Sequence, residues 1–298
     1  MIYRTLGKTG AEVSVVGVGT WQFGGEWGVE FEQTTVDTIF RTAKECGINL
    51  IDTAECYGPD HLSESLVGNA IAQDRDDWFL ATKFGHHYDD KFTRSEHRTA
   101  TDVTKQLEDS LRALKTDVID LYQYHSWADD EVFEDDVQAA LLKAKDQGKV
   151  RFLGNSVRTQ GDPIPQIRQS EEMSMEAIQI VFNRLQRNPE EGAFESCQQQ
   201  NLGVMARVPL ASGYLSGKYK PGHQFNDTEV RGRRDESEQR NAWLTEAQRI
   251  QKDEVPDGVN MAQWAIAWCL KNPAVHCVIP GVKNADQVRS NAAAVELL

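Results

Sequence analysis

The chain has few cysteines and no long apolar run. Its five cysteines include no CxxC pair, which argues against a disulfide framework and favours free thiols in a reducing compartment. No stretch of the 298 residues reaches the roughly 18 apolar residues that a membrane-spanning helix needs. The first residues, from Met1 to Gly7, also lack the apolar core of a signal peptide. We therefore expect a cytoplasmic protein with no membrane partner.

Positive charge is in deficit, with 32 Lys and Arg residues against 46 Asp and Glu residues and a formal net charge of −14. Such a surface repels the phosphates of nucleic acids and anionic membranes, so neither is expected as a partner. An anionic ligand would need a local cluster of positive side chains. No metal site is expected either, because His86 and His87 have no third ligand at a fixed spacing and predict an exposed loop. The sequence does not indicate an oligomeric state.

Short apolar runs of the strand type recur along the chain. Most are continuous rather than alternating, as expected for parallel strands that are covered on both faces. The predicted strands are Val15–Val18, Ile48–Ile51, Phe79–Thr82, Val118–Tyr124, Arg151–Gly154, Ile178–Phe182, Val204–Val208 and Cys277–Ile279. Segments with helical spacing lie between them, the clearest being Thr34–Cys46, Val103–Leu114, Val137–Gln147 and Met261–Lys271.

Eight strands alternating with helices predict an α/β protein, a single (β/α)8 TIM barrel that forms one domain over residues 1–298. The segment Tyr3–Val13, which has glycines in its middle, predicts a β-hairpin that closes the barrel floor. Two polar stretches do not fit the repeat. Gln160–Ser174 predicts a loop with a short helix, and Lys218–Asn241 predicts a long loop of the kind that forms lids or is disordered.

Four polar side chains stand at or just after the ends of three predicted strands. Asp52 follows the second strand and Tyr57 lies in the next loop, while Lys83 and His125 follow the third and fourth strands. Each residue alone would have an ordinary structural role, such as a turn cap or a buried histidine. Together they predict one site, because the carboxyl ends of barrel strands meet at the catalytic rim.

This set of residues suits proton transfer to a polarised oxygen. A free tyrosine has a pKa of about 10 and is a poor acid at neutral pH, but a nearby ammonium lowers that pKa. We expect Asp52 to hold Lys83, Lys83 to lower the pKa of Tyr57, and this phenol to act as general acid or base. His125 is expected to donate a hydrogen bond to a substrate carbonyl. None of these groups supplies electrons, so a nicotinamide hydride donor is implied.

The motif Asp52-Thr53-Ala54-Glu55-Cys56-Tyr57-Gly58 resembles the DTAxxYG signature of the aldo-keto reductases. Lys83 and His125 match the lysine and histidine positions of that family, and Gly17–Trp21 resembles its GxGTW opening. The similarity covers essentially the whole chain. It implies a barrel that reduces aldehydes or ketones to alcohols, or runs the reverse reaction, with NADPH or less often NADH. The family has no Rossmann unit, and no GxGxxG motif opens a βαβ unit here.

The resemblance also implies which residues bind the nicotinamide end of the cofactor. Ser156 and Gln179 match positions that bind the carboxamide, whereas Val157 replaces an asparagine that the family usually has. Arg207 stands where many members place an aromatic residue under the ring, and a planar guanidinium can also stack there. The cofactor residues implied at this end are Gly19, Thr20, Trp21, Asp52, Ser156, Gln179 and Arg207.

The phosphate and adenosine positions come from two further segments. Pro209–Lys218 resembles the pyrophosphate loop PLxxGxLxGK, where small residues let backbone amides approach phosphates. Gly281–Asn291 resembles the adenosine segment GxxxxxQxxxN. Lys283 and Arg231 are the candidate ligands of a 2′-phosphate, so NADP(H) is favoured over NAD(H), although Gln287 stands where some members carry an arginine. The implied contacts are Pro209, Leu210, Ser212, Gly213, Lys218, Arg231, Gly281, Lys283, Gln287 and Asn291.

Three tryptophans follow the first and fourth predicted strands, and with two of the catalytic candidates they are expected to line an apolar pocket for a small carbonyl or alcohol substrate. This predicted pocket consists of Trp21, Trp27, Tyr57, His125 and Trp127. Plain loop packing of the tryptophans is the alternative. Two other functions stay open: a redox-sensing subunit that holds NADPH and turns over slowly, as in the similar potassium-channel β subunits, and a Schiff-base aldolase that uses Lys83.

Overall fold

The computed structural model describes residues 1–126, 135–158, 161–234 and 237–298. Eight parallel strands form one sheet with the spatial order β12-β11-β10-β9-β8-β5-β4-β3. They correspond in order to the eight predicted strands. Their bounds are β3 (Val18–Gly19), β4 (Leu50–Asp52), β5 (Phe79–Phe84), β8 (Ile119–His125), β9 (Val150–Ser156), β10 (Ala177–Val181), β11 (Gly203–Arg207) and β12 (Cys277–Val278).

The sheet closes between its two outermost strands. The amide of Val278 donates to the carbonyl of Val15 at 2.9 Å, and the amide of Gly17 donates to the carbonyl of Val278 at 2.8 Å. The first strand was expected at Val15–Val18, but β3 begins only at Val18, because the residues before it pair through isolated bridges instead of a continuous ladder. A closed barrel of eight parallel strands is the (β/α)8 fold that the sequence predicts.

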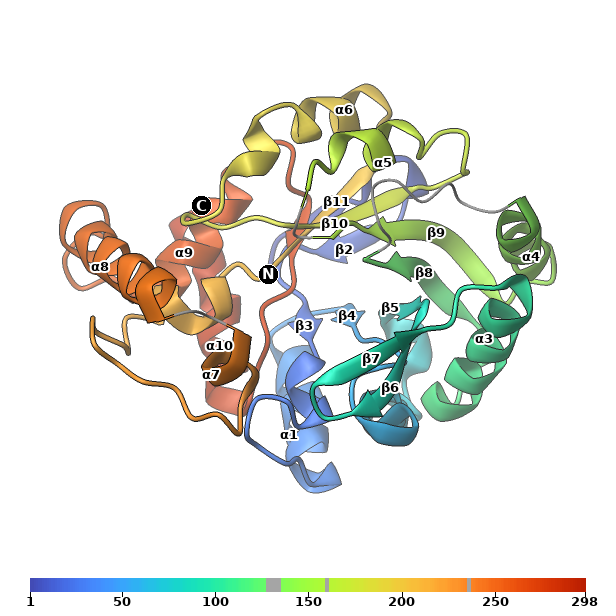
Figure 1. Cartoon of the computed structure of the whole chain (residues 1–298), viewed down its shortest axis with the longest axis horizontal. Coiled ribbons are helices and arrows are strands. Elements are labelled where there is room, and N and C mark those ends of the chain that lie inside the picture. The colour runs from blue at the N-terminus through green and yellow to red at the C-terminus, as the bar shows by residue number, and fades with distance from the viewer. Residues whose placement is uncertain (127–134, 159–160, 235–236) are drawn as a thin grey trace.

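Helices alternate with the strands and form the outer layer around the sheet (Figure 1). Helix α1 buries Val36, Ile39 and Phe40 on one face, as its sequence spacing predicts. The described helices are α1 (Gln33–Glu45), α2 (Leu62–Ile71), α3 (Ala100–Leu114), α4 (Asp135–Asp146), α5 (Ile164–Arg168), α6 (Ala193–Gln199), α7 (Val230–Arg234), α8 (Ser237–Asp253), α9 (Met261–Leu270) and α10 (Ala285–Ala292). Across the described ranges, none of them combines the length and apolar character that crossing a bilayer requires.

An N-terminal hairpin covers the bottom of the barrel, as predicted. Strand β1 (Tyr3–Thr5) pairs antiparallel with β2 (Glu12–Ser14). Leu6, in the turn between them, is fully buried and packs with residues from the barrel interior, among them Leu121 and Met205. Gly203 makes this approach possible, because a Cβ there would lie 2.6 Å from Leu6 Cγ. The hairpin therefore plugs the end of the barrel opposite the carboxyl ends of the strands.

Two expectations about loops were wrong. His86 and His87 do not lie in an exposed loop but in strand β6 (His86–Asp90), which pairs antiparallel with β7 (Thr93–Glu96). This hairpin is polar on both faces, so it lacks the apolar runs that indicate a buried strand. The long loop expected at Lys218–Asn241 contains α7 and the first turns of α8. The short helix expected within Gln160–Ser174 is present as α5.

Candidate active site

The carboxyl ends of β4, β5 and β8 bring the four predicted residues together. Lys83 of β5 extends its ammonium to Asp52 Oδ2 at 2.8 Å and to the hydroxyl of Tyr57 at 3.2 Å. The same nitrogen donates to the carbonyl of Thr53 at 2.7 Å. Lys83 is only 1% exposed, so its three protons meet three oxygens inside the protein. The chain Asp52–Lys83–Tyr57 inferred from the sequence is therefore a continuous set of contacts.

The second oxygen of Asp52 is held from the other side of the barrel. Gln179 of β10 donates to Asp52 Oδ1 at 2.6 Å, and Gln123 of β8 donates to the same oxygen at 3.4 Å. Ser156 of β9 donates to Gln179 Oε1 at 3.3 Å. Ser156 and Gln179, both predicted cofactor residues, thus belong to one network of buried polar groups that orients Asp52. Buried polar groups of this kind are stable only when they are hydrogen-bonded.

Burial sets the proton affinities of this cluster. It lowers the pKa of Lys83, although the charge of Asp52 opposes the change. The pKa of Tyr57 is raised well above its usual value, because burial and the charge of Asp52 both disfavour the phenolate. We had expected Lys83 to lower the pKa of this phenol, and the structure shows the opposite direction. Tyr57 is therefore neutral over the physiological range and holds a proton that it can donate.

His125, at the end of β8, packs edge to face against Tyr57. Its ring centroid is 5.9 Å from that of Tyr57, at an interplanar angle of 80°. His86 packs edge to face on it with centroids 5.0 Å apart, and Cys56 Sγ lies 3.6 Å from its Nδ1. Burial, followed by the charge of Lys83, holds the pKa of His125 well below its usual value. The imidazole is therefore neutral and has one N–H to donate.

The loop that carries Tyr57 has an unusual backbone that polar side chains support. Asp60 and His61 have φ values of 48° and 57°, in the left-handed region that side chains other than glycine rarely adopt. His61 Nδ1 lies 2.6 Å from Glu64 Oε2, and Thr82 Oγ1 donates to Glu64 Oε1 at 2.6 Å. Because Thr82 precedes Lys83, these contacts tie the tyrosine loop to the strand that carries the lysine.

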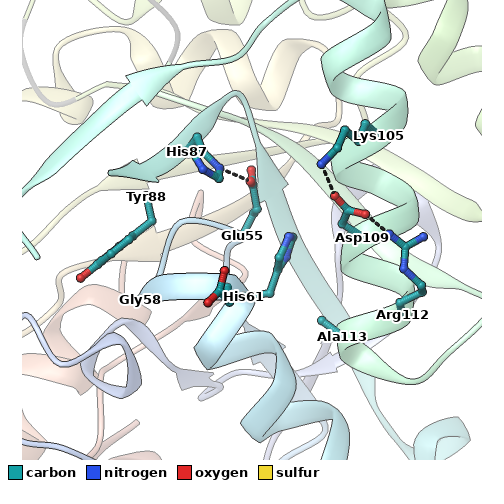
Figure 2. Close-up of a pocket in the computed structure, with 10 residues that line it drawn as sticks. Glu55, Gly58, His61, His87, Tyr88, Lys105, Asp109, Arg112 and Ala113 are labelled. Carbon is teal, nitrogen blue, oxygen red and sulfur yellow. Dashed lines mark hydrogen bonds and ion pairs between the residues drawn. The ribbon is translucent and has the colours of Figure 1, made fainter. Parts of the chain in front are cut away.

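A cavity of about 460 Å³ lies beside this loop, and its lining includes neither Tyr57 nor Lys83. Figure 2 shows that Glu55 and His61 face it from the loop, His87 from β6, and Asp109 from α3. Glu55 Oε1 lies 3.1 Å from His87 Nδ1, and Asp109 pairs with both Lys105 and Arg112 of its own helix. The cavity therefore adjoins the tyrosine loop without containing any of the four candidate catalytic residues.

Arg207 and Val157, the two departures from the family pattern among the predicted nicotinamide positions, lie side by side. The guanidinium of Arg207 donates to the carbonyl of Val157 at 2.9 Å. Its positive charge reaches the active site, where it acts on the pKa values of Tyr57, Lys83 and His125. The next residue, Val208, has a φ of 58°, and Asn183 Nδ2 donates to its carbonyl at 3.0 Å. Arg207 is thus held at the rim of the barrel beside the catalytic candidates.

The mouth of the site is bounded by aromatic rings and one ion pair. Trp21 stacks on Tyr57 with centroids 6.2 Å apart and packs edge to face on Trp27 at 5.0 Å. Glu26, in the loop after β3, is buried and forms an ion pair with Arg94 of β7. This ion pair joins that loop to the β6–β7 hairpin. Trp127, the third tryptophan of the predicted pocket, lies outside the described residues.

Two predicted cofactor residues at the end of β3, Gly19 and Thr20, pack closely against neighbouring strands. A Cβ on Gly19 would lie 2.6 Å from the carbonyl of Ile279, so only glycine permits this approach of the outer strands. Thr20 Oγ1 donates to the backbone carbonyl of Asp52 at 3.1 Å. These contacts fix the loop that carries Trp21 relative to Asp52.

The predicted pyrophosphate segment contains an irregular 3-10 stretch, Ala211–Ser216, that is interrupted by non-helical backbone at Ser212, Gly213 and Leu215. Pro209 is buried, Leu210 is half-buried, and Lys218 is exposed at the end of the segment. Ser212 and Gly213 have positive φ, and Arg231 Nη1 donates to the carbonyl of Ser212 at 3.3 Å.

Arg231 itself is almost fully buried in this region. It pairs with Glu229 at 2.7 Å, and its guanidinium lies 4.0 Å from the ring centroid of Phe225 and 5.5 Å from that of Trp27. Arg231 therefore holds the polar segment before α8 against the predicted pyrophosphate loop and against the mouth of the site.

The predicted adenosine segment, Gly281–Asn291, covers part of the loop after β12 and most of α10. Lys283 reaches the carbonyl of Trp27 at 3.3 Å, and its backbone amide donates to Gln287 Oε1 at 2.8 Å. Burial lowers the pKa of Lys283, and the positive charges of Arg231 and Lys218 lower it further. These cations are therefore close enough to repel one another in a chain that is strongly acidic overall.

Two further residues of this segment lie in buried or closely packed positions. Asn291 is 5% exposed, and its Nδ2 is buried with no hydrogen-bond partner in the described part of the chain. A Cβ on Gly281 would lie 2.0 Å from the side-chain amide of Gln22, which brings the loop after β3 onto the segment. Buried donors are rarely left unpaired in a folded protein, so the amide of Asn291 is suited to a ligand.

Comparison with known proteins identifies the family. The model of the Aldo/keto reductase family matches residues 15–298. The chain belongs to this family. Aldo-keto reductase YhdN of Bacillus subtilis is 29% identical over 97% of this chain and 87% of its own length. Aldo-keto reductase yakc [NADP(+)] of Schizosaccharomyces pombe is 25% identical over 96% of this chain and 84% of its own length.

A solved structure agrees with this assignment. The aldo-keto reductase AKR11C1 from Bacillus halodurans, in its holo form, superposes with a TM-score of 0.82 and is 29% identical, covering 99% of this chain and 91% of that chain. Aldo/keto reductases are oxidoreductases that generally use nicotinamide cofactors. The chain therefore shares the fold and the general activity of this family.

The residues of this aldo/keto reductase fit such a cofactor at both ends. Ser156 and Gln179 carry a hydroxyl and an amide beside Asp52, groups that would suit the carboxamide of a nicotinamide. Lys283 and the Asn291 amide, which has no partner among the described residues, offer the positive charge and the donor that the phosphate and adenine groups of such a cofactor would need. Among the described residues, no group of three or more His, Cys, Asp or Glu side chains is arranged to hold a metal ion.

Sequence reasoning missed several side chains that support this aldo/keto reductase site. Glu64 lies on α2, whose spacing of Leu62, Leu66 and Val67 is a helical signal that we overlooked. The pair Glu26–Arg94 spans 68 positions, and no local pattern indicates such a contact. The contact between Cys56 and His125 likewise depends on the barrel, which brings β8 beside the loop after β4.

Proposed function

We propose that this aldo/keto reductase is an NADP(H)-dependent oxidoreductase that reduces small aldehydes or ketones to alcohols, or runs the reverse reaction. The observation that supports this most strongly is the buried contact chain Asp52–Lys83–Tyr57. It places a neutral phenol beside an ammonium at the mouth of a barrel. A bound nicotinamide would supply or accept the hydride.

The proposed roles follow from the proton affinities of the side chains. Tyr57 donates its proton to the carbonyl oxygen as negative charge develops there. Burial makes this phenol a weaker acid by itself, so the transfer depends on that developing charge and on the ammonium of Lys83, 3.2 Å from the hydroxyl. Lys83 stabilises the phenolate that remains, and Asp52 holds the ammonium in place. The neutral ring of His125 donates a second hydrogen bond to the same oxygen. Trp21 and Trp27 form an apolar wall for the substrate.

The preference for NADP(H) rests on the adenosine end. Lys283 is flanked by Arg231 and Lys218, and a 2′-phosphate would relieve the repulsion among these cations. Arg231 is already paired with Glu229, so Lys283 is the stronger candidate ligand and Arg231 supports it. The name of the relative from Schizosaccharomyces pombe includes NADP(+), which favours the same choice. Gln287 contributes by fixing the backbone of Lys283.

The test is steady-state oxidation of NADPH with a panel of aldehydes and ketones, followed by the Tyr57→Phe variant. We expect turnover with the wild-type chain and a loss of roughly 10²- to 10⁴-fold in kcat for Tyr57→Phe, the range of general acid catalysis. NADPH binding, measured by the quenching of protein fluorescence, should be retained. Tyr88→Phe, on the neighbouring β6–β7 hairpin, is the matched control and should keep full activity. Unchanged turnover in Tyr57→Phe would remove this phenol from the mechanism.

A further inference from the structure

The contact between Cys56 and His125 has no part in the roles proposed above. Cys56 immediately precedes Tyr57 in the loop after β4 and is 3% exposed. Its Sγ lies 3.6 Å from Nδ1 of His125, which is within hydrogen-bond distance for sulfur. The other faces of the imidazole meet the rings of Tyr57 and His86. The thiol is thus placed against one particular nitrogen of the ring.

We propose that Cys56 is a positioning residue that fixes the tautomer of His125. Its S–H donates to Nδ1, so the single ring proton of the neutral imidazole resides on Nε2 and serves as the donor to the substrate oxygen. This inference rests on the proposed carbonyl reduction. It concerns a residue that the DTAxxYG motif leaves variable, and it gives that position a defined task in this chain.

The direction of this hydrogen bond follows from the proton affinities of both partners. Burial raises the pKa of the Cys56 thiol to about 12, so the sulfur keeps its proton. Burial lowers the pKa of His125, and the charges of Lys83, His86, Arg207 and Arg94 lower it further, so the ring carries one proton. An unprotonated imidazole nitrogen is a good acceptor, whereas thiol sulfur is a weak one. The arrangement with S–H as donor and Nδ1 as acceptor is therefore the more stable.

The tautomer matters because only one form helps the reaction. With the proton on Nε2, the ring and Tyr57 both present donors, which stabilises negative charge on a carbonyl oxygen. With the proton on Nδ1, the lone pair of Nε2 would face that oxygen and repel it. The hydrogen bond made by one ring nitrogen generally determines which proton the other carries. Loss of the thiol should populate the unproductive form.

The decisive measurement is nitrogen-15 NMR of the full chain with labelled histidine, which distinguishes protonated from unprotonated ring nitrogens. The chain has seven histidines, and the spectrum of His125→Gln identifies the signals of His125. We expect an unprotonated Nδ1 and a protonated Nε2 in the wild-type protein. A protonated Nδ1 would overturn the proposal. The NMR measurement does not require catalytic turnover, so its result is independent of the carbonyl-reduction assay. Failure of that assay would contradict the proposed function but not the tautomer of His125.

Variants test the role of the thiol. Cys56→Ala should give a mixture of both His125 tautomers and lower kcat by roughly three- to tenfold, the effect of one hydrogen bond. Cys56→Ser, whose hydroxyl can donate to the same nitrogen, should restore the wild-type spectrum and most of the activity. Cys197→Ala removes an equally buried thiol from an apolar cluster and should change neither. If Cys56→Ala keeps the wild-type tautomer, or keeps wild-type kcat, the positioning role is wrong.

Discussion

Lys83 Nζ lies 2.8 Å from Asp52 Oδ2 in a part of the barrel that excludes water from both side chains. Strands β4 and β5 are neighbours, and the residue pair bridges their carboxyl ends. Two buried charges are stable only when they are paired and their remaining donors and acceptors are used. Thr53 and Tyr57 use the other protons of Lys83, while Gln179 and Gln123 bind the other oxygen of Asp52.

The first prediction concerns this pair. Asp52→Asn should lower the free energy of unfolding by about 3 kcal/mol, because it leaves the ammonium of Lys83 buried without its counter-ion. The double variant Asp52→Asn, Lys83→Met should be more stable than Asp52→Asn alone, since the unpaired charge is gone. Urea denaturation of the wild type, both single variants and the double variant gives the coupling energy. Additive effects of the two substitutions would show that the pair does not interact in the folded state.

The sequence predicted the barrel because a parallel strand covered on both faces needs a continuous apolar run. Leu80 and Leu121 lie in such runs, and each run ends at a reactive side chain. The same logic could not find the β6–β7 hairpin, where Tyr88 and Arg94 lie on strands with little apolar content. It also could not give the direction of the Tyr57 pKa, which depends on how deeply the phenol is buried.

The second prediction concerns the floor of the barrel. Leu6→Ala should destabilise the protein by about 2–5 kcal/mol, because it removes a fully buried side chain and leaves a cavity among rigid strands. Activity measured well below the unfolding temperature should change little, since the catalytic rim is at the other end. Ile2→Ala, at an exposed position in the same N-terminal segment, is the control and should cost less than about 0.5 kcal/mol. Equal losses for the two variants would contradict the plugging role of Leu6.

The third prediction concerns cofactor choice. Lys283→Met should weaken NADPH binding by roughly ten- to a hundredfold, the value of a charge-assisted hydrogen bond, and should leave NADH binding nearly unchanged. Lys271→Met, at the exposed end of α9, should alter neither. Calorimetric titration with both cofactors supplies the comparison. A parallel loss of NADPH and NADH affinity would mean that Lys283 binds a part common to the two molecules rather than the 2′-phosphate.

The limits of the sequence argument are clearest at this end of the site. Lys283 and Arg231 were selected together because both are cations near cofactor motifs. The structure gives them different surroundings: Arg231 is buried among aromatic rings and pairs with Glu229, whereas Lys283 Nζ donates to the backbone carbonyl of Trp27. The ion pair between Glu229 and Arg231 depends on the backbone at the start of α7, which the sequence of this segment does not reveal.

The last prediction is a pH dependence of stability that originates at His61. Burial alone would lower the pKa of this histidine, but the hydrogen bond and charge of Glu64, together with the charges of Glu55 and Asp109, outweigh burial and raise it. A raised folded-state pKa means that the folded protein binds this proton more tightly than the unfolded chain. The resulting stabilisation is fully present below the unfolded pKa of about 6.5 and is lost as pH rises through the folded-state pKa.

His61→Gln should remove this dependence, because an amide can still donate to Glu64 but does not titrate. The measurement is the free energy of unfolding between about pH 6 and 9, a window that follows from the upward direction of the shift. His223→Gln, at an exposed position, is the matched control and should keep the wild-type profile. Burial also raises the pKa of Glu55, so its contribution to stability is present at low pH and is lost as pH rises above the unfolded value of about 4.5; the His223→Gln control retains it. Superimposable profiles for His61→Gln and the wild type would show that the His61–Glu64 pair does not carry the stabilisation assigned to it.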